Sequence, residues 1–109
     1  MKVLDHTAAL ARAGGDLELL REIAVLFQEE CPRVMEELRQ AFERGDGPGA
    51  GRAAHGLKGS ASNFGAAPAV EAALRIEQLA REGRIHEAGS AYEALEHAVA
   101  TLVGELKEV

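Results

Sequence analysis

A histidine flanked by glycines is the feature of this sequence with the clearest capacity for chemistry. On a helical wheel of residues 50–64, His55 lies about 150° from the centre of the apolar stripe and should face solvent. Gly51 and Gly59 stand one turn before and one turn after it, where alanine would favour a helix by roughly 1 kcal/mol. With no side chains at these positions, a partner molecule can approach the imidazole ring closely.

The residues around His55 favour attack on a phosphoryl group. A neutral imidazole is a nucleophile near pH 7 because its ordinary pKa is about 6.5. Lys58 can neutralise part of the charge of an attached phosphoryl group, Ser62 can donate a hydrogen bond to it, and Arg52 adds a second cation. None of the 18 acidic residues falls within residues 47–70, so no carboxylate of this segment would repel an incoming phosphate.

Helical periodicity supplies the elements that must position this histidine. We expect a short helix from Asp5 to the Gly14–Gly15 pair, and a long one from Asp16 to Gly45 that Pro32 bends or divides. Three more follow: 48–64, 68–83, and about 86–106, the last burying Tyr92. Four substantial amphipathic helices with short connections predict an all-α fold, an antiparallel four-helix bundle with a short additional N-terminal helix.

Composition agrees with this fold and excludes several classes of protein. The chain has 109 residues, which predicts a single domain over 1–109, and alanine fills 21 positions. A net charge of −6 argues against nucleic-acid binding. There is no apolar run long enough to span a membrane and no signal peptide, and the lone Cys31 excludes an internal disulfide. We therefore expect a cytoplasmic protein, monomeric and without a membrane partner.

The segment around His55 also resembles a known family. Residues 55–66 read HGLKGSASNFGA, which closely resembles the H-x-L-K-G-S-x-x-x-x-G-A signature of histidine-containing phosphotransfer (HPt) domains. Upstream, residues 14–20 and Phe27 are similar to the family's usual lead into its long helix. The Ile76–Glu77 pair resembles its Leu–Glu. The resemblance therefore covers nearly the whole chain.

This resemblance implies a role for particular residues. His55 would accept a phosphoryl group from a phospho-aspartate on a receiver domain and pass it to an aspartate of another response regulator. Lys58 would stabilise the phosphoryl group and Gly59 would leave room for the receiver. Ser60, Asn63 and Gly65 would be structural. We expect the partner to contact the outer surface of this helix, at the following residues: Gly51, Arg52, Gly59 and Ser62.

The implied partners are response-regulator receiver domains and a hybrid sensor histidine kinase. The chain lacks the G-x-x-x-x-G-K-[ST] loop that binds ATP phosphates, so we expect a phosphocarrier rather than an enzyme that uses ATP. No cofactor is expected, and Mg²⁺ should come with the receiver's own acidic pocket. Met1 and the compact length favour a free-standing carrier over a segment of a larger kinase.

Three other interpretations remain. The first is an adaptor that binds a receiver or kinase without phosphate, although such a protein needs neither His55 nor Lys58. A metal-binding bundle lacks the helical ligand pairs it requires, because no histidine or carboxylate lies three or four residues from His55. A nucleophilic hydrolase lacks an orienting acid near His55 in the sequence. His6, His86 and His97 have no comparable neighbours and are interpreted as solvated residues.

Overall fold

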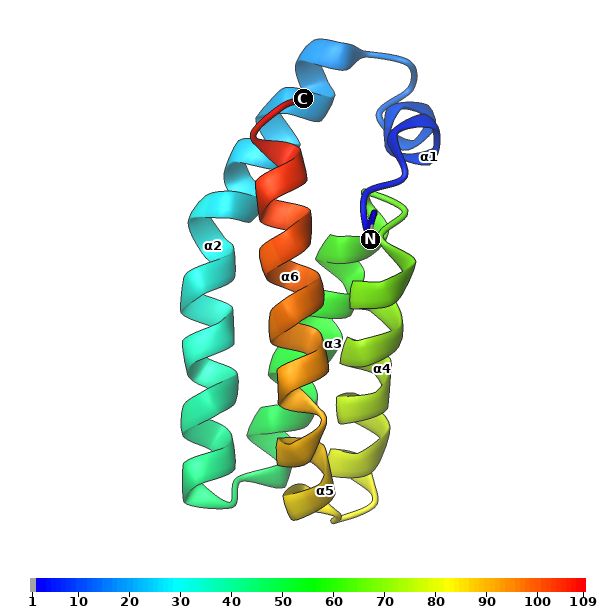
Figure 1. Ribbon diagram of the computed structural model, residues 1–109. Helices are drawn as coiled ribbons and strands as arrows, with labels where there is room; N and C mark the ends of the chain where they lie inside the picture. The colour runs from blue at the N-terminus through cyan, green and yellow to red at the C-terminus, as the bar shows by residue number, and fades with distance from the viewer. Residues whose placement is uncertain (1) are drawn as a thin grey trace.

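The computed structural model describes residues 2–109, and every regular element in this range is an α-helix (Figure 1). In chain order the helices are α1 (His6–Arg12), α2 (Leu17–Arg44), α3 (Gly47–Ser62), α4 (Ala67–Arg81), α5 (Ile85–Ser90) and α6 (Tyr92–Leu106). The long helices α2, α3, α4 and α6 form an antiparallel bundle, with α1 at one end and α5 at the other, and the molecule as a whole measures 41 × 22 × 20 Å. The predicted all-α bundle with an extra N-terminal helix is confirmed.

Short local signals set most of the helix boundaries. Asp5, Asp16 and Asp46 are N-caps, and the side chain of each accepts a hydrogen bond from a backbone N–H in the first turn of α1, α2 and α3. The chain leaves α2 through Gly45 in the left-handed conformation, with φ of 65°, which glycine adopts without the steric cost that other residues meet. These caps explain why the connections between bundle helices are short.

Pro32 does not divide the long helix. The α2 helix continues from Leu17 to Arg44 with the proline inside it, and Figure 1 shows the helix leaning before this region and running straight after it. A proline lacks one backbone hydrogen bond, yet the apolar stripe keeps its register across it, with Cys31 and Leu38 both buried. Of the two predicted outcomes, bending and division, the second is wrong.

The C-terminal segment differs from its prediction. The single helix expected over 86–106 is two helices, which meet at Ala91. The backbone N–H of Ala91 is shared between the carbonyls of Glu87 and Ala88, so the chain tightens for one turn before α6 begins. Tyr92 is consequently half-buried at the start of α6 instead of fully buried, and its ring meets Phe42 edge-on at 5.7 Å.

Small side chains bring α3 and α4 close together. These two helices form the most extensive contact in the bundle. Their facing surfaces are lined by buried alanines, which permit a short separation between the helix axes: Ala50, Ala54, Ala61, Ala69, Ala73 and Ala80. The spacing is so tight at one end that a Cβ atom added to Gly47 would lie 3.3 Å from the carbonyl oxygen of Ala80. Residues on α3 and α4 can therefore share one site.

Hydrogen bonds attach the N-terminal segment to one end of the bundle. The backbone N–H groups of Val3 and Leu4 each donate to Oε1 of Glu105 at 2.9 Å, and the N–H of Asp5 donates to the carbonyl of Phe64. Gly65 allows this approach, because an added Cβ would lie 2.9 Å from that of Asp5 and its φ is +57°. Within residues 2–109, no helix combines the length and apolar character that crossing a membrane requires.

Candidate functional site

His55 lies in the middle of α3 and its ring projects into solvent. Its side chain is 61% exposed, whereas the adjacent Ala54 and Leu57 are buried. The predicted outward direction is therefore confirmed. Gly56 and Gly59 lie on the same open surface, because a Cβ atom added at either position would meet no atom within 4 Å. The imidazole stands clear of its neighbours on α3.

Gly51 lies in a different environment from the one predicted. It is buried, and an added Cβ would be in ordinary contact, at 3.8 Å, with the Cβ of Ala80 on α4. A wheel drawn for one helix cannot show this because it ignores the helix that covers that side. The expected place for Gly51 on the outer surface beside His55 is therefore wrong, and its contact with a partner stays a prediction.

A buried carboxylate from α4 contacts the ring of His55. Glu77 is 2% exposed, and its Oε2 atom lies 2.9 Å from Nδ1 of His55. Its other oxygen, Oε1, accepts a hydrogen bond from Nζ of Lys58 at 2.7 Å. The guanidinium of Arg81, one turn further along α4, contacts Oε2 at 2.6 Å. One carboxylate thus joins three nitrogen-bearing side chains across the α3–α4 contact.

These partners keep the carboxylate ionised. Burial by itself raises the pKa of the Glu77 carboxyl, but hydrogen bonds from Lys58 and His55 and the charge of Arg81 outweigh it. The net effect is a pKa below the ordinary value. An ionised carboxylate only accepts hydrogen bonds, so Nδ1 of His55 must carry the proton in this pair. In the neutral form of the ring, Nε2 is then the nitrogen that keeps its lone pair, and it is the one that does not contact Glu77.

The expectation of a site without carboxylates was wrong. Residues 47–70 contain no acid, but α4 brings Glu77 into contact with His55 from 22 residues further along the chain. A signal was present in the sequence: Glu77 directly follows the inward-facing Ile76 and lies three residues before Ala80, which places an acid on the core side of its helix. Only the packing of α3 on α4 reveals what that acid contacts.

The other predicted residues are distributed around this pair. Lys58 is 25% exposed and is held by Glu77. The hydroxyl of Ser62 donates to the backbone carbonyl of Lys58 at 2.8 Å, so its proton is engaged within α3 instead of being directed at a phosphoryl group. Arg52 is exposed, and among residues 2–109 no carboxylate lies within ion-pair distance of it.

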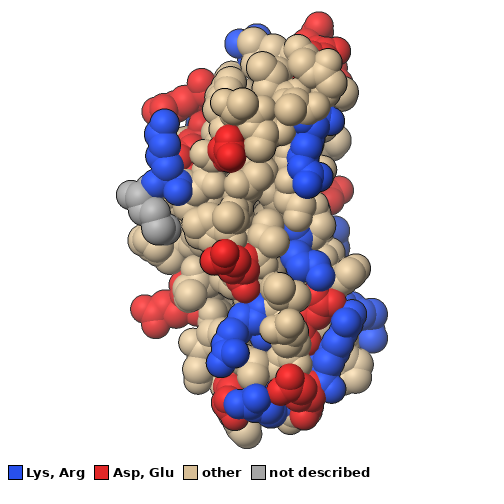
Figure 2. All heavy atoms as spheres, turned by 90° about the vertical axis from the view of Figure 1, so that its right-hand side faces the viewer, with Lys and Arg blue, Asp and Glu red and all other residues tan. Residues whose placement is uncertain are grey.

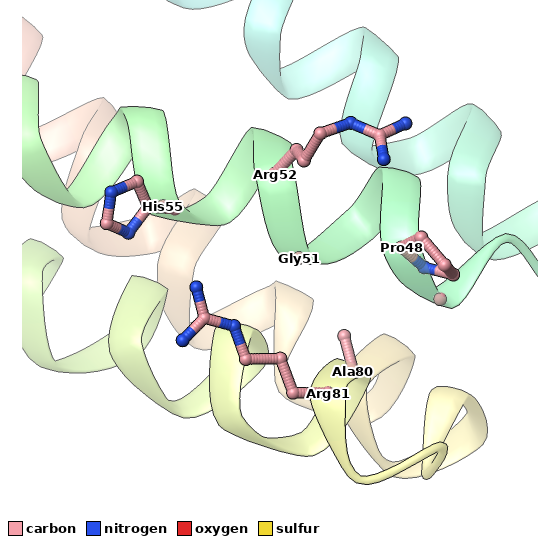
Figure 3. A pocket seen from close by; sticks show the side chains of 7 residues that line it. Pro48, Gly51, Arg52, His55, Ala80 and Arg81 are labelled. Carbon is pink, nitrogen blue, oxygen red and sulfur yellow. The ribbon is translucent and has the colours of Figure 1, made fainter.

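Two hollows border the exposed face of α3. A cleft of about 430 Å³ extends from His55 along the α3–α4 contact (Figure 3). On the other side of α3, a groove of about 290 Å³ separates it from α2 and is lined in part by Leu26, Phe27, Ser60 and Asn63. Leu26 is 57% exposed, which is unusual for a large apolar residue on a helix that has a buried stripe. No three His, Cys, Asp or Glu side chains in the described range gather in a way that could hold a metal ion.

Fold and site together define a class of protein: an antiparallel helical bundle that presents one solvent-facing histidine, supported by a buried carboxylate. The chain belongs to the Hpt domain family, whose model matches residues 22–105. Members of this family act in histidine phosphotransfer in two-component signalling, where they interact with receiver domains and kinases.

A solved structure with the same fold is that of histidine-containing phosphotransfer protein B (HptB) from Pseudomonas aeruginosa PAO1. It is 23% identical to this chain, with a TM-score of 0.89 over 97% of this chain and 92% of that one. No curated protein matches the chain significantly. The family assignment therefore rests on the matched family model, and the solved structure adds agreement in fold.

Proposed function

We propose that this protein is a phosphocarrier in which His55 accepts a phosphoryl group from a phospho-aspartate on a receiver domain and passes it to an aspartate of another response regulator. One observation carries the proposal: Nδ1 of His55 is held by the ionised Glu77, which leaves Nε2 exposed with its lone pair free. The site provides a positioned nucleophile, and the donor and acceptor groups belong to partner proteins.

The transfer step balances with these groups. The lone pair of Nε2 attacks phosphorus, the bond from phosphorus to the aspartate oxygen breaks, and the aspartate leaves as a carboxylate. The proton on Nδ1 stays in place, so the phosphorylated ring gains positive charge, and Glu77 faces that charge at 2.9 Å. Return transfer to a second aspartate reverses these steps, and Glu77 holds the ring in one orientation throughout.

Charge on the phosphoryl group is balanced mainly by the partner in this proposal. Lys58 lies next to His55 and can share its ammonium group between Glu77 and the phosphoryl oxygens. We propose that Mg²⁺ is supplied by the receiver domain and that the chain uses no ATP of its own. The expected cytoplasmic location and monomeric state belong to the same proposal.

Docking of the receiver would use the open surface around Gly59. Its lack of a side chain leaves space beside the imidazole, and Leu26 in the neighbouring groove offers apolar area within the same face of the protein. Exposed apolar area next to a reactive group is typical of a surface that a protein partner covers. Arg52 and Ser62 remain predicted contacts on this face.

The proposal is tested with His55→Gln. Each receiver domain of the source organism would be phosphorylated with a small acyl phosphate and mixed with the wild-type chain, and phosphohistidine would be measured. We expect transfer to the wild type from at least one receiver and no detectable transfer to the variant, while circular dichroism shows the same helical content. His97→Gln, which changes an exposed histidine of α6, is the matched control and should transfer normally.

Two results would contradict this proposal. Phosphorylation of the His55→Gln variant would place the modified residue elsewhere in the chain. A wild-type chain that binds a receiver but never becomes phosphorylated would instead favour the phosphate-independent adaptor, particularly if His55→Gln bound that receiver with the same affinity.

A further inference from the structure

The cleft beside His55 is bounded by two arginines. Its floor is apolar and consists of Pro48, Gly51 and Ala80, and its volume is about 430 Å³. Arg52 from α3 and Arg81 from α4 both line it. Figure 3 shows the Arg81 guanidinium reaching from α4 towards His55, and the Arg52 guanidinium directed away from Arg81 along the outer side of α3. The transfer step proposed above uses His55, Lys58 and Glu77 and gives the cleft itself no part.

The charge around the cleft is positive, on a protein whose net charge is −6. Arg81 contacts the buried Glu77, and its side chain is 68% exposed. Arg52 has no carboxylate within ion-pair distance among residues 2–109. Arg52 also lines a second hollow, whose other charged residues are Glu37, Arg44 and Asp46. Two cations therefore border the cleft, and Glu77 is the single carboxylate that contacts either of them.

Positive charge of this kind is not general over the surface. On the face shown in Figure 2, Lys and Arg side chains are interspersed with Asp and Glu over the lower part, and side chains of both signs also surround an uncharged area in the upper part. Several other arginines are neutralised by neighbours on their own helix, as Arg33 is by Glu37 and Arg39 by Glu43. An arginine without such a neighbour, next to the reactive histidine, is free to meet a carboxylate of another protein.

We propose that this cleft receives an acidic side chain of the docking receiver domain, which Arg52 and Arg81 bind by charge and hydrogen bonds. The inference rests on the proposed phosphocarrier function and adds a recognition subsite to it. From Gly47 to His55 the cleft extends along α3 for about 12 Å, at roughly 1.5 Å per residue. Its occupant is therefore a residue other than the aspartate that exchanges the phosphoryl group. The apolar floor suits the methylene groups of such a side chain.

The charge of this cleft should affect the association of the receiver domain more than the phosphotransfer step itself. Exposed charge pairs at the edge of an interface accelerate association and weaken with salt, because the screening length falls from about 10 Å at 0.1 M to about 3 Å at 1 M. The arginines should thus act mainly on the receiver concentration that half-saturates transfer, and less on the maximal transfer rate. An effect on the half-saturating concentration that exceeds the effect on the maximal rate distinguishes the cleft arginines from the residues that contact the His55 ring.

The test compares two double variants of equal charge. Arg52→Gln with Arg81→Gln neutralises the cleft, whereas Arg12→Gln with Arg75→Gln removes two arginines of α1 and α4 that form no ion pair within residues 2–109. The probe is the phosphorylated receiver that transfers fastest to the wild type. Initial transfer rates are measured against receiver concentration at low salt and at about 1 M salt. Arg52→Gln alone is included because Arg52 does not contact Glu77.

We expect the cleft variant to raise the half-saturating receiver concentration about fivefold at low salt, with little difference at high salt. Arg52→Gln alone should also raise the half-saturating receiver concentration. The control variant, Arg12→Gln with Arg75→Gln, should have the same half-saturating concentration as the wild type. Equal behaviour of the two double variants would overturn the inference. So would a lower maximal rate with unchanged half-saturation, which would mean that Arg81 acts through Glu77. If the proposed phosphocarrier function is wrong, the wild-type chain itself accepts phosphate from no receiver. That result differs from failure of the cleft inference, in which the wild type accepts phosphate and the two double variants behave alike.

Discussion

Glu77 determines what His55 can do more than any residue on the histidine's own helix. The carboxylate fixes the proton on Nδ1 and orients the ring, so that Nε2 points outward. Lys58 and Arg81 in turn keep that carboxylate charged although it is only 2% exposed. In the proposed function, the nitrogen that attacks phosphorus is therefore positioned by a group that does not contact the phosphoryl donor.

Glu77→Gln should separate this positioning role from a purely structural one. The amide preserves the volume and can still accept a hydrogen bond, but it removes the negative charge that faces the phosphorylated ring. We expect transfer to His55 to slow about tenfold, which corresponds to about 1.4 kcal/mol in the activation free energy. Rapid-quench measurement of phosphohistidine formation at saturating receiver checks this. Glu71→Gln, which changes an exposed acid on the same helix, is the control, and equal rates for both variants would refute the role.

Within each helix, local signals made the boundaries predictable. The caps at Asp5, Asp16 and Gly45 act within one turn of the chain, so a reading of neighbouring residues finds them. The outward direction of His55 was predictable for the same reason, since the apolar stripe of α3 repeats regularly. The break at Ala91 was not, because it depends on a one-turn change of hydrogen bonding that leaves no clear pattern in the sequence.

Contacts between helices were the part that the sequence could not supply. The burial of Gly51 and the position of Glu77 both follow from the separation and register of α3 against α4. A wheel treats each helix alone, so it assigned Gly51 to solvent and left Glu77 out of the site. The register depends on how two alanine-lined surfaces fit together, which is a property of both helices at once.

We expect Gly59→Leu, on the surface of α3, to slow transfer without destabilising the fold. Leucine favours a helix over glycine by roughly 0.8 kcal/mol, and an added Cβ meets no atom within 4 Å, so the variant should be at least as stable as the wild type. Transfer should slow, because the new side chain occupies the space where a receiver approaches His55. Gly104→Leu on α6 has the same open surroundings and serves as the control. Urea unfolding and transfer rates are measured for both, and unchanged transfer in Gly59→Leu would contradict the access argument.

In the proposed function, stability and phosphotransfer are linked because the same carboxylate would serve both. Glu77 joins α3 to α4 through Lys58 and His55, across the most extensive helix contact of the fold. The network that prepares the histidine is therefore also one of the polar connections that hold the bundle together. Its contribution to the free energy of unfolding must follow the ionisation of Glu77.

This link predicts how stability changes with pH. The pKa of Glu77 is lower in the folded chain than in the unfolded chain, where it is about 4.3. Between these two values the unfolded state binds more protons, so the free energy of unfolding rises with pH in that window. The contribution of Glu77 is fully present above a pH of about 4.3 and is lost as the pH falls through the folded value.

The measurement is a comparison of wild type and Glu77→Gln by urea unfolding from about pH 3 to pH 7, a range that spans the ordinary glutamate pKa. Other carboxylates contribute equally to both chains, so the difference between the two free energies isolates Glu77. We expect this difference to change in favour of the wild type as pH rises through the window, and to be constant at higher pH. A difference that does not vary with pH would mean that Glu77 has the same pKa in both states, and a change of opposite sign would mean that burial dominates over Lys58, His55 and Arg81.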